Sequence, residues 1–314
     1  STLYPLLMRK GTGLVVQVTR PSSSRFVFPW GFIYDIPLYS DREPQFCSIV
    51  ENWDDRSPLF TDTPHQCPTG KHAPNTLCPF GFWGFRHSIE QLSRTDKPPT
   101  PIAAPADFTM VMAETQYEVD RDLLKVHAKD LAGILKRTFP GAHLDEGLDL
   151  ASIKALLGQD TPLVYFYCHG ERPKYGSSDT ILGVGNREIL SSKDFNGWVT
   201  EWYDYGEGRL IWDKVRPLIF INACHSIDIN PDSLVTYLDA FIGTGHASGV
   251  IGTEVRVDQT LAMEAAKEFF ESFLGGASIG EALHKMQADF LRSGNLFGLA
   301  YTPYCWSDLT LKKM

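Results

Sequence analysis

Two short apolar stretches constrain the fold of this chain more than any other feature. Residues 164–170 read VYFYCHG and residues 218–224 read LIFINAC. Each combines aromatic and β-branched residues and ends at a reactive side chain, His169 in the first and Cys224 in the second. Buried parallel strands deliver residues to the carboxyl edge of a sheet in this way. We therefore expect His169 and Cys224 to lie close together at one sheet edge.

A thiol beside an imidazole can act as the nucleophile and the base of a cysteine protease. A free cysteine is only a few per cent thiolate at pH 7, so His169 would assist thiolate formation or protonate the leaving amine. Backbone N–H groups of Gly170 and Cys224 are the expected oxyanion donors. Taken alone, Cys224 could be a buried small hydrophobe and His169 a core hydrogen-bonding group; their pairing on two matched strands favours the catalytic interpretation. Cys168 should face the opposite side, in the core.

Composition limits the class of protein. The chain has 314 residues, of which 43% are hydrophobic, and a net charge of −9, as is ordinary for a soluble protein with one large core or two modest ones. The sequence has no clustered Lys/Arg run for direct nucleic-acid binding and no apolar stretch near the roughly 18 to 20 residues that span a bilayer. The N-terminus lacks a signal-peptide pattern, and six cysteines are too few for a disulfide scaffold. We expect a cytoplasmic protein without a cofactor.

A proline-rich linker at residues 97–105 divides the chain. Residues 1–100 are expected to form a smaller region rich in strands and loops, either part of the main unit or a pseudo-protease subdomain. Residues 106–314 alternate between strand and helix patterns, which predicts an α/β fold with a mainly parallel sheet and helices on both faces.

The expected elements follow from periodicity and breakers. The expected strands are 14–18, 108–113, 142–144, the two stretches above, 249–255 and 297–301, with a hairpin at 180–190. One expected helix ends near residue 139. The others cover residues 149–157, 233–241, a long segment after 258, and 279–291. A helix is expected to start at residues 191–194, followed by an aromatic-rich connection from Trp198 to Trp212.

Residues 40–80 are expected to form an elaborate loop, because Pro, Asp, Thr and Asn dominate this segment. It contains five potential metal ligands: Cys47, His65, Cys67, His72 and Cys78. Their spacing matches no established zinc-finger pattern, so a surface loop with scattered thiols and imidazoles is the preferred interpretation, and a tetrahedral zinc site is the alternative.

The sequence resembles a CHAT domain. The resemblance rests on the run ending in His169-Gly170, the run ending in residues 222–226 (NACHS), and residues 249–258 (GVIGTEVRVD) with the two helices after them. Residues 28–35 (FPWGFIYD) are also similar to a stretch found upstream in such proteins. The resemblance covers residues 108–311 and, more weakly, 25–39.

The resemblance implies a cysteine endopeptidase of the caspase-like superfamily, with caspases, separases and gingipains. The caspase block Gln-Ala-Cys-x-Gly is here Asn-Ala-Cys-His-Ser, which speaks against a true caspase. CHAT proteases often belong to bacterial defence systems and cleave a dedicated protein partner, including gasdermins and components of RNA-guided systems. A protease that is silent until an activating partner docks, and a pseudoprotease that serves as an interaction module, are the alternatives.

The resemblance also implies that the region after the nucleophile strand shapes the specificity pocket. Alternation places Glu254, Arg256 and Asp258 on one side if that strand continues. A carboxylate there would select a substrate with Arg or Lys immediately before the cleaved bond, and Asp258 is a better candidate for this role than Glu254. Asp258 could instead cap the following helix, and Arg256 could neutralise Glu254.

Overall fold

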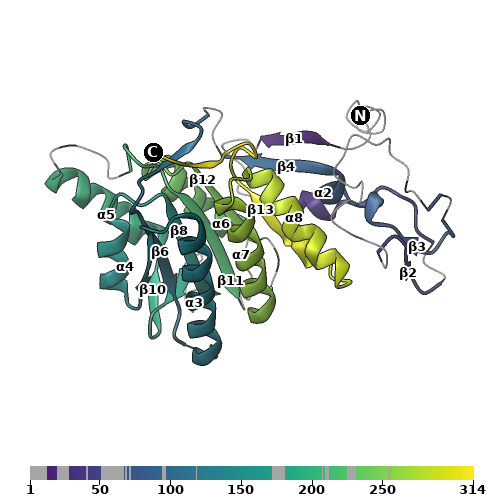
Figure 1. Ribbon diagram of the computed structural model, residues 1–314, viewed down its shortest axis with the longest axis horizontal. Helices are drawn as coiled ribbons and strands as arrows, with labels where there is room; N and C mark the ends of the chain where they lie inside the picture. Colours follow the sequence, from purple (N-terminus) through teal and green to yellow (C-terminus); the bar gives the residue numbers. More distant parts are fainter. Residues whose placement is uncertain are drawn as a thin grey trace.

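A computed structural model of the chain forms a central sheet flanked by helices, with a smaller N-terminal extension at one end (Figure 1). The structure describes residues 13–19, 28–39, 42–50, 67, 69–70, 72–93, 97–117, 119–171, 181–206, 208, 212–224, 231–253, 255 and 257–314. Side chains are not described at 170–171, 181, 223–224 and 231–234.

In the described residues the central sheet has eight strands, and its core is parallel. Neighbouring strands in the order β7-β6-β8-β11-β12 are all parallel, β13 pairs antiparallel with β12 at one edge, and the β9–β10 hairpin pairs antiparallel with the end of β8. The strands are β6 (Thr109–Glu114), β7 (His143–Gly147), β8 (Leu163–Glu171), β9 (Ile181–Val184), β10 (Glu188–Leu190), β11 (Leu218–Cys224), β12 (Gly249–Thr253) and β13 (Tyr301–Pro303). The predicted mainly parallel sheet is confirmed.

Three helices cover one face of the sheet. They are α3 (Arg121–Thr138), α7 (Gln259–Leu274) and α8 (Ile279–Arg292). Their apolar residues, Leu131, Phe270 and Met286 among them, form one core cluster with Tyr165 of β8 and Phe220 of β11. These side chains face one way because alternate strand residues share a face.

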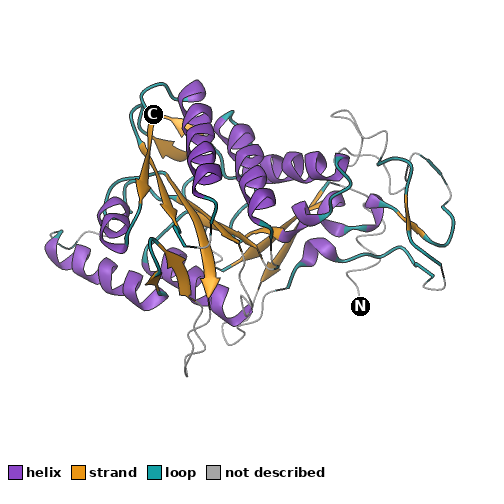
Figure 2. Cartoon of the chain, turned by 90° about the horizontal axis from the view of Figure 1, so that it is seen from below, coloured by secondary structure: helices purple, strands orange, loops and turns teal. Residues whose placement is uncertain are grey.

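The opposite face is covered by α4 (Leu150–Leu157), α5 (Ser192–Tyr205), α6 (Pro231–Leu238) and the π-helical turn η4 (Asp239–Thr244). Here the intervening strand residues, such as Phe166 and Ile219, pack with Phe195, Trp212 and Phe241. Helices therefore lie on both faces, as predicted, and Figure 2 shows the sheet enclosed between them.

Side-chain caps fix where several helices begin. Asp120 accepts hydrogen bonds from the first backbone N–H groups of α3, and Asp149, Ser191 and Ser278 form capping boxes for α4, α5 and α8. Each cap satisfies N–H groups that have no partner within the helix.

The N-terminal region is built from short elements. They are β1 (Leu14–Thr19), η1 (Trp30–Phe32), β2 (Gln45–Phe46), β3 (Thr76–Leu77), η3 (Pro79–Gly81), α2 (Trp83–Arg86) and β4 (His87–Leu92). β1 pairs parallel with β4, and β2 with β3. After the linker, β5 (Ile102–Ala104) pairs with β14 (Leu311–Lys313), which joins the start of the main unit to the end of the chain. The predicted division of the chain at residues 97–105 stays a prediction.

Two predicted elements are wrong. The segment expected as an aromatic-rich connection is largely helix α5: Phe195, Trp198, Val199 and Trp202 recur at helical spacing and pack toward the core, after the Ser191 cap. The closing strand is expected too early, because residues 297–300 form the 3₁₀ helix η5 (Phe297–Ala300) and β13 begins at Tyr301.

No helix in the described part of the chain combines the length and the apolar character needed to cross a bilayer.

Candidate active site

His169 and Cys224 are direct neighbours across two parallel strands. In the register of β8 against β11, Cys224 is the partner of His169, and Leu218 is the partner of Leu163. Strands paired in this way lie about 4.8 Å apart. The backbone positions of both residues thus meet at the carboxyl edge of the sheet, whereas the side chain of Cys224 lies outside the described part of the structure. That the two side chains form a dyad stays a prediction.

Strand alternation sets the face on which His169 lies. Tyr167 and Tyr165, two and four residues before it, belong to the core beneath α3 and α7, and His169 itself is buried. Cys168 belongs to the core on the opposite face, as predicted.

A backbone carbonyl orients the imidazole of His169. Its Nε2 lies 2.6 Å from the carbonyl oxygen of Tyr117. A carbonyl oxygen can only accept a hydrogen bond, so Nε2 carries the proton and Nδ1 is the basic nitrogen of the neutral ring.

The segment that carries Tyr117 is held by the β9–β10 hairpin. The N–H of Gln116 donates to the main-chain carbonyl of Gly185 at 2.7 Å, and the N–H of Gly185 donates to the main-chain carbonyl of Glu114 at 2.8 Å. The guanidinium of Arg187 lies 4.2 Å from the ring centroid of Tyr117. Gly185 has φ +54°, and a Cβ there would come within 3 Å of the carbonyl oxygen of Leu148. The hairpin turn therefore requires glycine at this position.

The orienting carbonyl was missed by sequence reasoning. The sequence indicates no third catalytic side chain, and the group that the structure places against His169 is a main-chain oxygen. Any residue type supplies such an oxygen, so the sequence holds no signal for it.

Glu114 is a second group that sequence reasoning missed. It ends β6, opposite Tyr167 of β8, and its side chain is buried. Burial, followed by the nearby charge of Glu146, raises the pKa of the Glu114 carboxyl to about 7. A carboxyl beside this sheet edge thus exchanges its proton near neutral pH.

Asn222 anchors the strand that leads to Cys224. Its side-chain nitrogen donates to the hydroxyl of Tyr165 at 3.2 Å and to the carbonyl of Ala262 in α7, and its oxygen accepts from the hydroxyl of Tyr301 at 3.0 Å. His127 of α3 also contacts the Tyr165 hydroxyl, at 3.0 Å. This buried network ties β11 to β8, α3, α7 and β13. It therefore holds in place the backbone of the strand that ends at Cys224.

The predicted oxyanion donors have different surroundings. β8 does not end at His169 but continues to Glu171, and Gly170 is the register partner of Leu182 in β9. Cys224 is the last residue of β11. The oxyanion role of their N–H groups stays a prediction.

The predicted specificity residues follow β12, which ends at Thr253. Glu254 and Arg256 lie outside the described residues. Asp258 is the N-cap of α7, and its carboxylate accepts a hydrogen bond from the N–H of Thr260 at 2.9 Å. It also lines a surface hollow with Glu264, Glu268 and Asp289. The capping alternative is therefore observed, and a role in substrate binding stays a prediction.

Four of the five potential metal ligands of the N-terminal loop come together: Cys47, Cys67, His72 and Cys78. His65 lies outside the described residues. The picture of scattered thiols and imidazoles, preferred from the sequence, is wrong for these four residues because the fold gathers them from segments far apart in the chain.

Comparison with known proteins places this architecture in a family. The CHAT domain model matches residues 85–312. A probable protease from Vitiosangium sp. (strain GDMCC 1.1324) is 28% identical over 334 aligned positions, which cover 94% of this chain and 39% of that protein. The chain thus spans about two fifths of the relative's length. The relative's name, probable protease, agrees with the predicted class of enzyme, a peptidase.

Three solved structures show more distant similarity. The Arg-specific cysteine proteinase gingipain R is 13% identical with a TM-score of 0.48, over 72% of this chain and 56% of its own. The Drosophila initiator caspase Dronc is 8% identical with a TM-score of 0.39, and the match covers 71% of this chain and 92% of the Dronc chain. Separase in the Saccharomyces cerevisiae separase–securin complex is 17% identical with a TM-score of 0.43, and the match covers 72% of this chain and 14% of the separase chain. The family model alone spans well over half of the sequence, and this chain belongs to the CHAT domain family.

Proposed function

We propose that this chain is a cysteine endopeptidase in which Cys224 is the nucleophile and His169 is the base. The observation that carries the proposal is the register of β8 and β11, which makes these two residues neighbours at the carboxyl edge of the sheet. The hydrogen bond from His169 Nε2 to the carbonyl of Tyr117 supports it, because this bond leaves Nδ1 as the basic nitrogen.

The reaction follows from these roles. Nδ1 of His169 takes the proton of the Cys224 thiol, and the thiolate attacks the carbonyl carbon of the scissile peptide. The N–H groups of Gly170 and Cys224 stabilise the resulting oxyanion. The imidazolium then gives its proton to the leaving amine, and water, activated by the same nitrogen, hydrolyses the thioester and regenerates the thiol. The Tyr117 carbonyl stabilises the imidazolium through the Nε2 proton throughout.

We further propose that the substrate is a dedicated protein partner in a bacterial defence or regulated cell-death system, of the gasdermin or RNA-guided type. Support comes from membership of the CHAT family together with the resemblance described above, which implies a defence setting. Activation by a docked partner fits the same setting. The preference for Arg or Lys before the cut, through Asp258, belongs to this proposal.

The test compares wild-type protein with the Cys224→Ala and His169→Ala variants. Candidate substrate proteins encoded nearby are incubated with each variant, alone and with candidate activators, and cleavage is followed by mass spectrometry of the fragments. We expect cleavage by the wild type, none by Cys224→Ala, and a rate at least about 100-fold lower for His169→Ala. His143→Ala is a matched control, because this half-exposed histidine lies on β7, outside the site.

Thiol labelling gives a readout that needs no substrate. A limiting amount of iodoacetamide should modify Cys224 first, because the other five cysteines are buried. The labelling should be slower in His169→Ala, because His169 assists formation of the reactive thiolate. Equal cleavage by Cys224→Ala would refute the proposal. Selective labelling that does not depend on His169, with no cleavage of any candidate, would favour the interaction module instead.

A further inference from the structure

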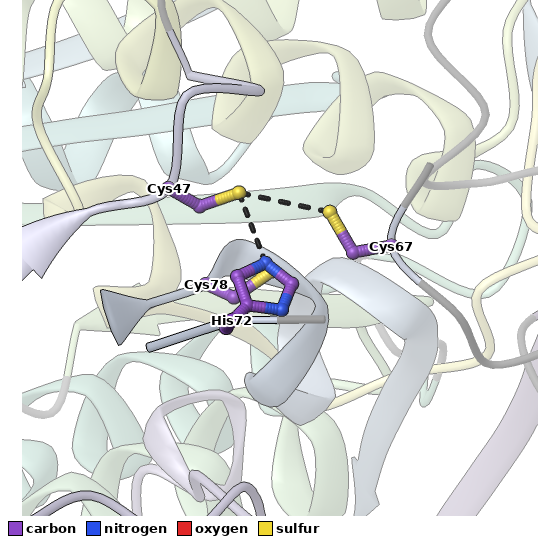
Figure 3. A group of neighbouring side chains, drawn as sticks. All are labelled: Cys47, Cys67, His72 and Cys78. Carbon is purple, nitrogen blue, oxygen red and sulfur yellow. Dashed lines mark hydrogen bonds between the residues drawn. The ribbon is translucent and has the colours of Figure 1, made fainter. Parts of the chain in front are cut away.

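Three cysteines and one histidine converge in the N-terminal region, away from the proposed active site. The ligand atoms of Cys47, Cys67, His72 and Cys78 all lie within 4.8 Å of one another. Figure 3 shows the four side chains directed toward a common centre. The three cysteines are buried, with at most 8% of their surface exposed, and His72 is partly buried.

The distances match a tetrahedral metal site. Zinc lies about 2.3 Å from thiolate sulfur and about 2.0 Å from imidazole nitrogen, so two sulfur ligands of a tetrahedron are about 3.8 Å apart, and sulfur and nitrogen about 3.5 Å. Here the sulfurs of Cys47 and Cys67 are 3.6 Å apart, and the Cys47 sulfur is 3.1 Å from Nε2 of His72. A disulfide needs about 2.0 Å between the sulfurs, so Cys47 and Cys67 are not bonded to each other.

We propose that these four residues bind one structural zinc ion. Three thiolates and one imidazole complete a tetrahedral coordination shell and leave no open position for water or substrate, as in zinc sites that support structure rather than catalysis. The soft sulfur ligands select zinc over magnesium or calcium, which prefer oxygen ligands.

Thr69 provides a supporting contact. Its hydroxyl oxygen lies 3.0 Å from the sulfur of Cys67 and 3.3 Å from the sulfur of Cys47. A hydroxyl can donate a hydrogen bond to a metal-bound thiolate, and such contacts orient the ligands and moderate their charge.

The site would hold together described segments that have little secondary structure of their own. β2 and β3 pair over only two residues each, too few to be stable alone. The three cysteines pack with Phe80, Phe85 and Leu291 of α8 in one small core cluster. Zinc would therefore fasten residues 42–50 and 72–82 to α8 of the main unit, at the opposite end of the molecule from α5 and β10 (Figure 1). The proposal does not depend on the proposed protease activity.

The first experiment measures the metal content. The full chain is purified under reducing conditions from cells supplied with zinc, and metal and protein are quantified together. We expect about one zinc ion per chain in the wild type. The Cys67→Ser and His72→Ala variants should each lose most of this zinc. Cys305→Ala is the matched control, because Cys305 is a buried thiol outside the cluster and its replacement should leave the zinc content unchanged.

Two further measurements keep the proposal testable if the ligand variants fold poorly. Cobalt(II) exchanged into the wild-type protein should give the strong visible absorption of a tetrahedral thiolate site, and zinc binding to the metal-free protein should release protons from the three thiols. A zinc chelator should lower the unfolding temperature and increase proteolytic cleavage within residues 42–82. A folded wild-type chain that takes up neither zinc nor cobalt would overturn the proposal. So would a Cys47–Cys67 disulfide in a metal-free folded chain, or full zinc content in the double variant Cys67→Ser/His72→Ala.

Discussion

Glu114 should make the protein less stable as pH rises toward neutrality. Its pKa is about 7 in the folded chain, against about 4.3 for an unfolded glutamate. Between these values the unfolded chain releases the proton and the folded chain keeps it, so the free energy of unfolding falls with increasing pH by about 1.4 kcal/mol per unit. The loss reaches about 3 kcal/mol near pH 7 and then levels off. Below about pH 4 both states are protonated and the effect disappears.

The Glu114→Gln variant tests this reasoning because it keeps the shape of the side chain and cannot ionise. Urea unfolding of wild type and variant is measured at several pH values from 4.5 to 8. The variant should gain stability relative to wild type, by an amount that grows from near zero at the lowest pH to about 3 kcal/mol at the highest. Glu146→Gln should recover a smaller part of this gain, since the charge of Glu146 contributes less than burial to the raised pKa of Glu114. A difference between wild type and Glu114→Gln that is constant with pH would refute the argument.

Three other changes have defined outcomes. Burial lowers the pKa of His127 to about 4, so the stability of the wild type relative to His127→Gln, measured by urea unfolding, should fall by about 3 kcal/mol between pH 6.5 and pH 4. The opposite change that Glu114 causes in this pH range is present in both proteins and cancels in the comparison. Asn222→Ala should lower the free energy of unfolding by about 2 to 4 kcal/mol because it removes the shared partner of two buried hydroxyls and a carbonyl, whereas Asn186→Ala in an exposed turn should change it by less than about 0.5 kcal/mol. Asp258→Ser keeps a capping side chain and removes the charge, so profiling with peptides that differ at the residue before the cut should show a weaker Arg/Lys preference. Asp258→Ala should in addition cost about 1 kcal/mol in thermal unfolding, and an unchanged peptide preference in both variants would leave Asp258 only its capping role.

The sequence predicted the parts of the fold in which local pattern and burial agree. β8 and β11 are continuous apolar runs because both faces of these strands are covered by helices. Their reactive ends fall at one sheet edge because parallel strands share a direction, so the neighbouring positions of His169 and Cys224 followed from two short segments.

The features that the sequence did not predict depend on contacts between distant segments. The body of helix α5 was mistaken for a connection because its aromatic residues suit strands and loops as well as helices, although they recur at helical spacing. Phe195 packs against Trp212 and Phe241, contacts between distant segments that the sequence does not indicate. The metal-ligand cluster brings together residues 47 and 78, which no known spacing relates. The pKa of Glu114 depends on burial, which the residue type does not indicate.

The orientation of His169 depends on a change of neighbours along β8. β6 pairs with β8 as far as Tyr167, and β9 takes its place from His169 onward. The chain that leaves β6 is therefore free to turn over the sheet edge, where its Tyr117 carbonyl meets the imidazole. Gly185 and Arg187 of the hairpin hold this segment in place. The imidazole of His169 is thus oriented by main-chain geometry, and in the proposed mechanism substitutions in the hairpin would act on catalysis through the position of one oxygen atom.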